Sequence, residues 1–123
     1  MDKTSFEQLV LQALDELPRR IWLKIENIAV VVEEKPSREL LSRQGIKSPG
    51  TLLGLYQGIP KNKRGRHYAN VLPDKITIFK KPIESLCQNK IQLVQKIKEV
   101  VLHEIGHYFG FSEQELRKYL STR

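Results

Sequence analysis

The beginning of the chain has hydrophobic residues at the spacing of an amphipathic helix. The residues that follow the i, i+3, i+4, i+7 rule are Phe6, Leu9, Val10, Ala13, Leu14 and Leu17. Thr4 and Glu7 have the spacing of a capping box, in which two side chains bind backbone N–H groups at a helix start. The pattern therefore predicts a first helix. Pro18 either ends this helix or begins a new turn after it.

Two apolar runs predict strands on either side of a connection. IAVVVEE begins at residue 28 and is a run of β-branched residues suited to a strand that is buried on both faces. TLLGLYQG begins at residue 51 and predicts a second strand. KPSRELLSRQGIKSPG lies between them and mixes Pro, Ser and Gly with the pattern of a single helical turn, which is typical of a connection.

A third strand is predicted for KITIFK, from residue 75, in which Ile76 and Ile78 share one face. The loop of residues 59–74 separates it from the second strand. A connection of this length in a compact domain is often functional, so we expect the loop to contribute to a site.

A long helix is predicted near the end of the chain, over residues 90–109, after a short helix that begins at Pro82 and runs through Leu86. The apolar stripe of the long helix consists of Val94, Ile97, Val101, Ile105 and Tyr108. We expect Tyr108 and Phe109 to belong to the core rather than to catalysis. The order of elements predicts an α+β fold, with the long helix packed on a small mixed sheet and a short helix at the C-terminal end.

The composition is that of one ordinary globular domain over residues 1–123. Hydrophobic residues make up 40% and charged residues 28%, which excludes a disordered or fibrous chain. A single cysteine, Cys87, cannot form an internal disulfide, and we expect it to be a small buried apolar group rather than a nucleophile. The N-terminus predicts no signal peptide, and no apolar run has the length of a membrane span, so we expect a cytoplasmic protein with no membrane partner.

The net charge is +7, from 21 basic and 14 acidic residues, and the excess is concentrated in the middle third of the chain. The basic runs at 61–66 and 80–81 can attract phosphate backbones or acidic partners. A solvated loop has the same composition. Nucleic acid therefore stays open as a partner without being favoured, and the oligomeric state is unknown from the sequence.

VVLHEIGHYFGFSEQEL, residues 100–116, contains the pattern that points most directly to chemistry. His103 and His107 are four residues apart, so on a helix their imidazoles project from one face and can bind one ion. Glu104 stands beside the first ligand and can act on a water molecule as general base. We therefore predict a Zn²⁺ site. The alternative is a surface helix whose two histidines bind no metal.

A third ligand must lie in the short tail after His107 or upstream of the motif. Gly110 can take a left-handed conformation that reverses the chain, so residues just after it can fold back beneath the histidines. The spacing favours the carboxylate of Glu113 as the third ligand. The alternatives are Glu115, His67 and Asp74.

Other residues around the motif have structural explanations as well. Ser112 and Glu115 form a capping box for a last helix that ends near Leu120, and this cap is compatible with Glu113 as a ligand because it would fix that residue in place. Gly106 lies between the histidines, where a glycine costs about 1 kcal/mol relative to alanine. We expect it to allow a close approach of the sheet or a substrate.

The segments LLGLYQGIPKNKRGRHYANVLPDKITIFKKPI and VVLHEIGHYFGFSEQEL resemble the small bacterial proteins called minimal zincins, or zincin-like metallopeptidases. The similarity extends back through FEQLVLQALDELP and NIAVVVEEKPS and covers nearly the whole chain. The resemblance implies a compact α+β zincin core, with His103 and His107 as zinc ligands and Glu104 as the base. Family members commonly have Asp where this chain has Glu113, whose longer side chain adds a methylene group.

The leading hypothesis is therefore zinc-dependent hydrolysis of peptide bonds, with a peptide or protein as substrate. Glu104 would take a proton from the attacking water and return it to the departing amine. Candidates for an oxyanion donor are Arg66, His67 and Tyr68 on the long loop, and none of them is preferred. The second strand would pair with an extended peptide if it lies at an edge of the sheet rather than in its interior.

Two other functions fit part of the sequence. A zinc-dependent endoribonuclease would explain the basic loop KNKRGRHY, but the small endoribonucleases of this type lack a glutamate after the first histidine. A zinc-bound interaction module without turnover would not need that glutamate either. Glu104 therefore favours the peptidase over both alternatives.

Overall fold

The computed structural model of the protein describes residues 1–25, 27–58, 74–112 and 114. In chain order, its elements are α1 (Lys3–Asp15), α2 (Arg19–Trp22), β1 (Ile28–Glu33), α3 (Arg38–Arg43), β2 (Gly54–Gln57), β3 (Asp74–Phe79), α4 (Lys80–Glu84) and α5 (Lys90–Tyr108). Helices and strands are both present, and the predicted α+β fold is confirmed.

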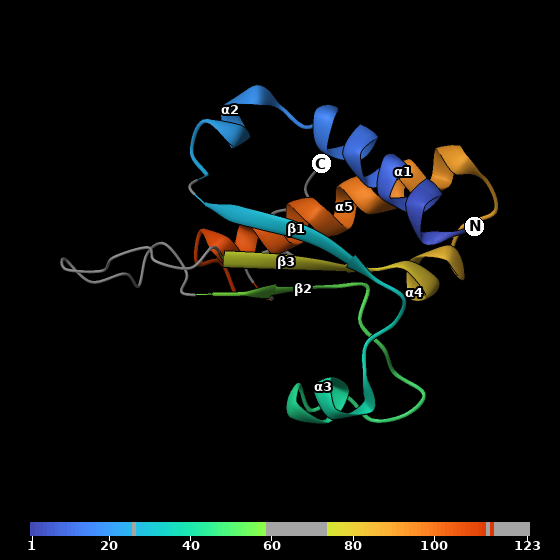
Figure 1. Cartoon of the computed structure of the whole chain (residues 1–123). Coiled ribbons are helices and arrows are strands. Elements are labelled where there is room, and N and C mark those ends of the chain that lie inside the picture. Colours follow the sequence, from blue (N-terminus) through green and yellow to red (C-terminus); the bar gives the residue numbers. More distant parts are fainter. Residues whose placement is uncertain (26, 59–73, 113, 115–123) are drawn as a thin grey trace.

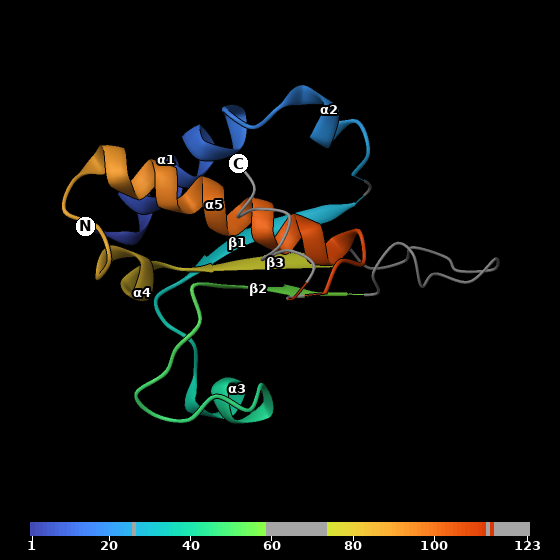
Figure 2. The same cartoon turned by 180° about the vertical axis from the view of Figure 1, so that it is seen from behind.

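The three strands form a mixed sheet in the order β1-β3-β2. β1 pairs with β3 in parallel, and β2 pairs with β3 in antiparallel orientation. α5 lies across one face of this sheet and α1 packs on α5, as the front view in Figure 1 and the view from behind in Figure 2 both show. The sequence correctly predicted a long helix laid on a small sheet.

The first helix exists as predicted, but its predicted cap is wrong. Asp2 is the N-cap residue, and its Oδ1 accepts a hydrogen bond of 2.8 Å from the backbone N–H of Ser5. Hydrogen bonds from the side chain and from the backbone of Ser5 lower the pKa of the Asp2 carboxyl. The helix therefore begins at Lys3, before the predicted cap residue Thr4. An aspartate side chain caps a helix N-terminus as well as a threonine side chain does. Pro18 separates α1 from the single turn of α2, in agreement with the prediction.

β1 is a strand, as predicted, but the prediction that both of its faces are buried is wrong. Val32 is only 6% exposed, whereas Val31 on the opposite face is 36% exposed. Among the described strands, β1 lies at one end of the order and pairs with β3. The β-branched composition therefore indicated a strand, but it did not indicate that one face would be left open to solvent.

The connection between β1 and β2 contains the expected helical turn, which is α3. The Ser37 side chain caps it by accepting a hydrogen bond of 3.0 Å from the Leu40 N–H. α3 lies away from the sheet and from the other helices (Figure 1). The helix predicted to begin at Pro82 begins at Lys80 instead, because proline is tolerated throughout the first turn of a helix and so does not mark its first residue.

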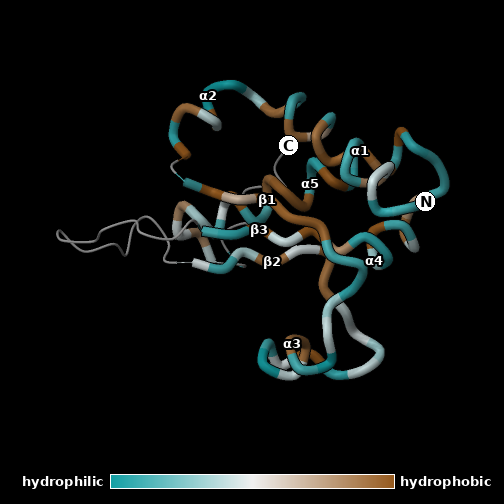
Figure 3. Tube along the Cα trace, in the orientation of Figure 1, coloured by the Kyte–Doolittle hydropathy of each residue, from teal (hydrophilic) through white to brown (hydrophobic). Residues whose placement is uncertain are grey.

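The core lies between the sheet, α1 and α5. All five residues of the predicted α5 stripe are buried, and the side chain of Asn89 caps the helix on the Gln92 N–H at 2.9 Å. Hydrophobic and hydrophilic stretches alternate along α1, α5 and the strands (Figure 3), as amphipathic elements require. Within the described residues, no helix combines the length and hydrophobicity needed to cross a membrane.

Two single-residue predictions about packing are also confirmed, and a third, for Cys87, is confirmed in part. Tyr108 is fully buried, and Phe109 packs against the core from its edge. Cys87 is partly buried against the same core, and burial raises the pKa of its thiol. A cysteine with a raised pKa in an apolar environment is a poor nucleophile, as expected from its sequence neighbours.

Candidate metal centre

The last two turns of α5 bring His103, Glu104 and His107 together. One possible ligand atom from each side chain lies within 4.8 Å of the others. The two imidazole rings meet edge to face, with their centroids 5.1 Å apart and an angle of 75° between the ring planes. Both histidines are partly exposed, whereas Glu104 is 7% exposed. This is the arrangement that the i, i+4 spacing predicted, and it could hold a metal ion.

The His107 ring is oriented by the turn that follows the helix. Its Nδ1 lies 2.9 Å from the carbonyl oxygen of Phe111. A carbonyl oxygen only accepts hydrogen bonds, so Nδ1 must carry the proton and Nε2 is the nitrogen with a lone pair. Metal-binding histidines commonly have this arrangement, in which one nitrogen donates to a carbonyl and the other binds the ion.

Gly110 makes this turn possible. Its φ of 95° lies in the left-handed region that we predicted for it. The Gly110 N–H donates to the His107 carbonyl at 2.9 Å, and the Phe111 N–H donates to the Gly106 carbonyl at 3.0 Å. These two bonds form a Schellman motif, which reverses the chain and places the Phe111 carbonyl beside His107.

Glu104 is bonded to the edge of the sheet. Its Oε1 accepts a hydrogen bond of 2.9 Å from the backbone N–H of Tyr56 in β2. The strand can come this close because residue 54 is glycine. A Cβ at Gly54 would lie 2.6 Å from Cγ1 of Val100 and 3.5 Å from Cγ of Glu104. The sequence did not predict this contact, and the one signal for it was a glycine inside a strand pattern.

A cleft of about 970 Å³ runs between β2 and α5. The strand side consists of residues 51–56 and 58, and the helix side includes Val100, His103, Glu104 and His107. Within the described residues, β2 is the outer strand of the sheet on this side, so the cleft lies along the last described strand. The sequence had left open whether this strand lies at an edge or in the interior, and among the strands that the structure describes it is the last in the order.

The other predicted site residues divide into two groups. The first group lies outside the described residues and consists of Arg66, His67, Tyr68, Glu113 and Glu115. The loop of residues 59–73 and most of the predicted last helix also lie outside them.

Asp74, by contrast, is described. It is 3% exposed, and its Oδ2 accepts a hydrogen bond of 2.8 Å from the hydroxyl of Tyr56. It is not part of the group of possible metal ligands that the described residues form. Gly106, which we expected to permit close packing, is buried within α5.

The chain is similar to known proteins over most of its length. The family model described as zincin-like metallopeptidase matches residues 25–120. Among solved structures, a conserved hypothetical protein from Thermo thermophilus is similar, with a TM-score of 0.56 and 18% sequence identity. The match covers 99% of this chain and 100% of that one, and at this identity it shows the fold alone. No curated protein matches the chain.

Proposed function

Because the chain belongs to the zincin-like metallopeptidase family, we propose that it hydrolyses peptide bonds with a zinc ion bound by His103 and His107 and with Glu104 as the general base. The observation that supports this proposal most directly is the convergence of these three side chains within 4.8 Å on the wall of a cleft. Two imidazole ligands and a neighbouring carboxylate base are the groups that a His-Glu-x-x-His motif contributes to a catalytic zinc site, which needs one further protein ligand.

The donor set fits zinc. His107 Nδ1 bonds the Phe111 carbonyl at 2.9 Å, which leaves Nε2 as the nitrogen that can bind a cation. We propose Glu113 as the third protein ligand, on the basis of its spacing from the histidines and of the chain reversal at Gly110. When bound, zinc would supply Lewis acidity toward the substrate carbonyl and toward a water molecule.

Glu104 has the position that a general base needs. It is nearly buried, it lines the cleft, and the bond from the Tyr56 N–H fixes the orientation of its carboxylate. We propose that this carboxylate accepts the proton of the attacking water and returns it to the amine that leaves. Its fixed orientation would remove part of the cost of bringing base and water into line.

β2 provides a surface for the main chain of the substrate. It is the outermost described strand on its side of the sheet and forms one wall of the cleft that the two histidines line. An extended peptide that pairs with such a strand is held by its backbone, so binding does not demand a particular sequence. A peptide or an extended segment of a protein is therefore the substrate that this geometry favours.

Two measurements on the purified protein test the proposal. Metal analysis of the wild type and of His103→Ala should find zinc in the wild type and little in the variant, and zinc in neither would rule out the metal site. Incubation with a mixed peptide library and with structured RNA should show peptide cleavage that Glu104→Gln abolishes. Cleavage of RNA alone would favour an endoribonuclease, and bound zinc without any cleavage would favour an interaction module.

A further inference from the structure

Tyr56 and Asp74 form a partly buried polar pair beside the candidate metal centre. The Tyr56 hydroxyl donates a hydrogen bond of 2.8 Å to Oδ2 of Asp74, which is 3% exposed. Tyr56 lies opposite Ile76 in the register of β2 and β3, so Asp74 is its diagonal neighbour on the same face of the sheet. A hydrogen bond to a carboxylate in a buried place is among the stronger ones in a protein.

The chain closes over this pair at Gly58. A Cβ at Gly58 would lie 2.5 Å from Cγ of Asp74 and 2.9 Å from the hydroxyl oxygen of Tyr56. A Cβ at this distance would force the Asp74 carboxylate or the Tyr56 hydroxyl to shift, so glycine allows the backbone to lie directly against the two polar groups. Asp74 is therefore enclosed by the protein, whereas Tyr56 is partly buried and also lines the cleft.

The ring of Tyr56 is also fixed against α5. It meets the ring of Tyr108 edge to face, with the centroids 6.1 Å apart and an angle of 85° between the planes. Tyr108 is fully buried and follows His107 directly in the helix. Tyr56 is thus held at its hydroxyl by Asp74 and at its ring by α5.

The backbone of the same residue bonds the proposed base. The Tyr56 N–H donates to Oε1 of Glu104 at 2.9 Å, so a displacement of Tyr56 would move or break this bond. The side chain and the backbone of Tyr56 therefore connect Asp74, at the start of β3, with Glu104 on α5.

We propose that Tyr56, anchored by Asp74, is a positioning residue that holds the Glu104 carboxylate in the orientation for proton transfer. This inference rests on the proposed function for its catalytic consequence. The contact itself is independent of turnover, because it can be measured on the folded protein without substrate.

The test uses three variants of the full-length, zinc-loaded protein. Tyr56→Phe removes only the hydroxyl and keeps the ring and the backbone N–H. Asp74→Asn keeps an acceptor but removes its charge. Thr77→Val is the matched control, since it changes a buried residue of β3 that lies opposite Leu55 rather than Tyr56.

Hydrogen exchange and the proton chemical shift of the amide at position 56, measured by NMR, report on the bond to Glu104. In Tyr56→Phe we expect this amide to exchange roughly tenfold faster and its signal to move toward that of Glu104→Gln, since a bond to a charged group is lost or weakened. Asp74→Asn should give a smaller acceleration of about threefold, because a neutral acceptor forms a weaker bond. Thr77→Val should match the wild type.

Peptide hydrolysis supplies the second measurement. In Tyr56→Phe we expect kcat to fall roughly tenfold while KM changes less than about twofold, because the base rather than the substrate is misplaced. Zinc affinity should stay within about threefold of the wild type, since neither histidine is touched.

An amide at position 56 that is unchanged in Tyr56→Phe would overturn the inference. The same holds if all amides of β2 and α5 exchange faster to the same extent, because that pattern means general destabilisation. If Tyr56→Phe does not fold, an unchanged amide in Asp74→Asn overturns the inference in its place. A wild type that cleaves no peptide would contradict the proposed function, and the exchange data would still decide whether the pair positions Glu104.

Discussion

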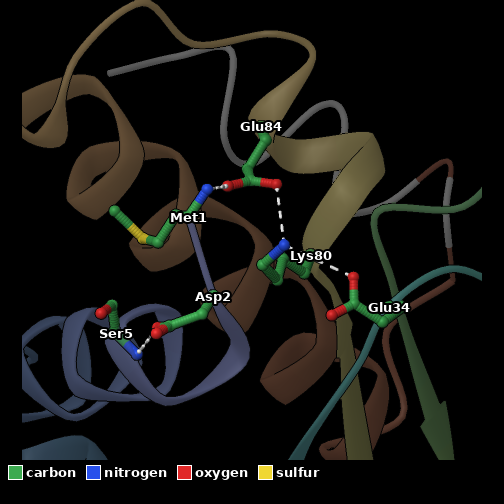
Figure 4. Close-up of polar contacts among 6 residues, drawn as sticks. All are labelled: Met1, Asp2, Ser5, Glu34, Lys80 and Glu84. Carbon is green, nitrogen blue, oxygen red and sulfur yellow. Dashed lines mark hydrogen bonds and ion pairs between the residues drawn. The ribbon is translucent and has the colours of Figure 1, made fainter.

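Lys80 and Glu104 are both charged and almost wholly buried, with exposures of 5% and 7%, but their surroundings differ. The Lys80 ammonium lies 3.2 Å from a carboxylate oxygen of Glu84 and 3.4 Å from one of Glu34. Glu84 in turn lies 3.5 Å from the N-terminal ammonium of Met1, as Figure 4 shows. Glu104 accepts from the neutral backbone N–H of Tyr56 and shares the wall of a cleft with two imidazoles.

The difference separates a structural role from a chemical one. Lys80 is matched by opposite charges from Glu84 in α4 and from Glu34, the residue that follows β1. Glu84 also contacts the N-terminus, so this cluster connects segments that are distant in sequence. A buried carboxylate beside two possible metal ligands in a cleft is instead typical of a functional site. This contrast supports our proposal that Glu104 serves catalysis and predicts that substitutions at the two positions have different consequences.

The largest effect is expected for Glu104→Gln. The amide can still accept from the Tyr56 N–H but cannot take a proton, so kcat/KM should fall by roughly 10²- to 10⁴-fold while the melting temperature changes little. Peptide hydrolysis and thermal unfolding measure the two quantities. Glu99→Gln is the matched control on the same helix and the same cleft, and it should keep activity. A large loss of stability without loss of activity would place Glu104 in the same class as Lys80.

The second effect concerns the turn that orients His107. Gly110→Ala puts a side chain on a residue with a φ of 95° and should displace the Phe111 carbonyl, so zinc should bind roughly 10- to 100-fold more weakly. Competition with a chelator measures this affinity. Gly45→Ala is the control, because Gly45 has a φ of 72° and is not among the residues that line the cleft. Equal zinc affinity in the two variants would show that the turn does not orient the ligand.

The third effect should appear in stability alone. Lys80→Met removes the charge that Glu34 and Glu84 share, so the melting temperature should fall clearly while zinc affinity and peptide cleavage persist. Lys81→Met changes the exposed neighbour and should leave the melting temperature within a few degrees of the wild type. If the two variants are equally stable, the Lys80 cluster does not contribute to folding.

The smallest effect is a pH dependence at alkaline pH. Burial lowers the pKa of Lys80, but the hydrogen bonds to Glu84 and Glu34 more than offset this, so its pKa lies above the ordinary value of 10.5. The contribution of Lys80 to stability is therefore complete below about pH 10.5 and is lost as the pH rises through the higher value of the folded state. Melting curves at increasing alkaline pH should converge for wild type and Lys80→Met. A constant difference between them would contradict this linkage.

Features that depend on local spacing could be predicted from the sequence. The i, i+4 spacing of His103 and His107 and the helical periodicity of α5 placed both imidazoles on one face, because a helix has a fixed geometry. The left-handed Gly110 was also predictable, since glycine after a helix end has a steric reason to be there.

Features that depend on tertiary contacts could not be predicted from the sequence. The bond from Tyr56 to Glu104 joins residues that are 48 positions apart, and it requires β2 to cross α5 at Gly54. The exposed face of β1 depends on which strand occupies the centre of the sheet, and composition does not determine that order. The cap at Asp2 shows a third limit, because two equivalent capping patterns lay within the same few residues.

The central claim is that the two imidazoles of α5 bind one zinc ion. X-ray absorption spectroscopy at the zinc edge of the zinc-loaded, full-length protein tests it most directly. We predict a spectrum with two imidazole ligands at about 2.0–2.1 Å and oxygen ligands at about 2.0–2.2 Å, with the imidazole signal reduced in His107→Ala. A spectrum with oxygen ligands alone, the same in both proteins, would contradict the claim.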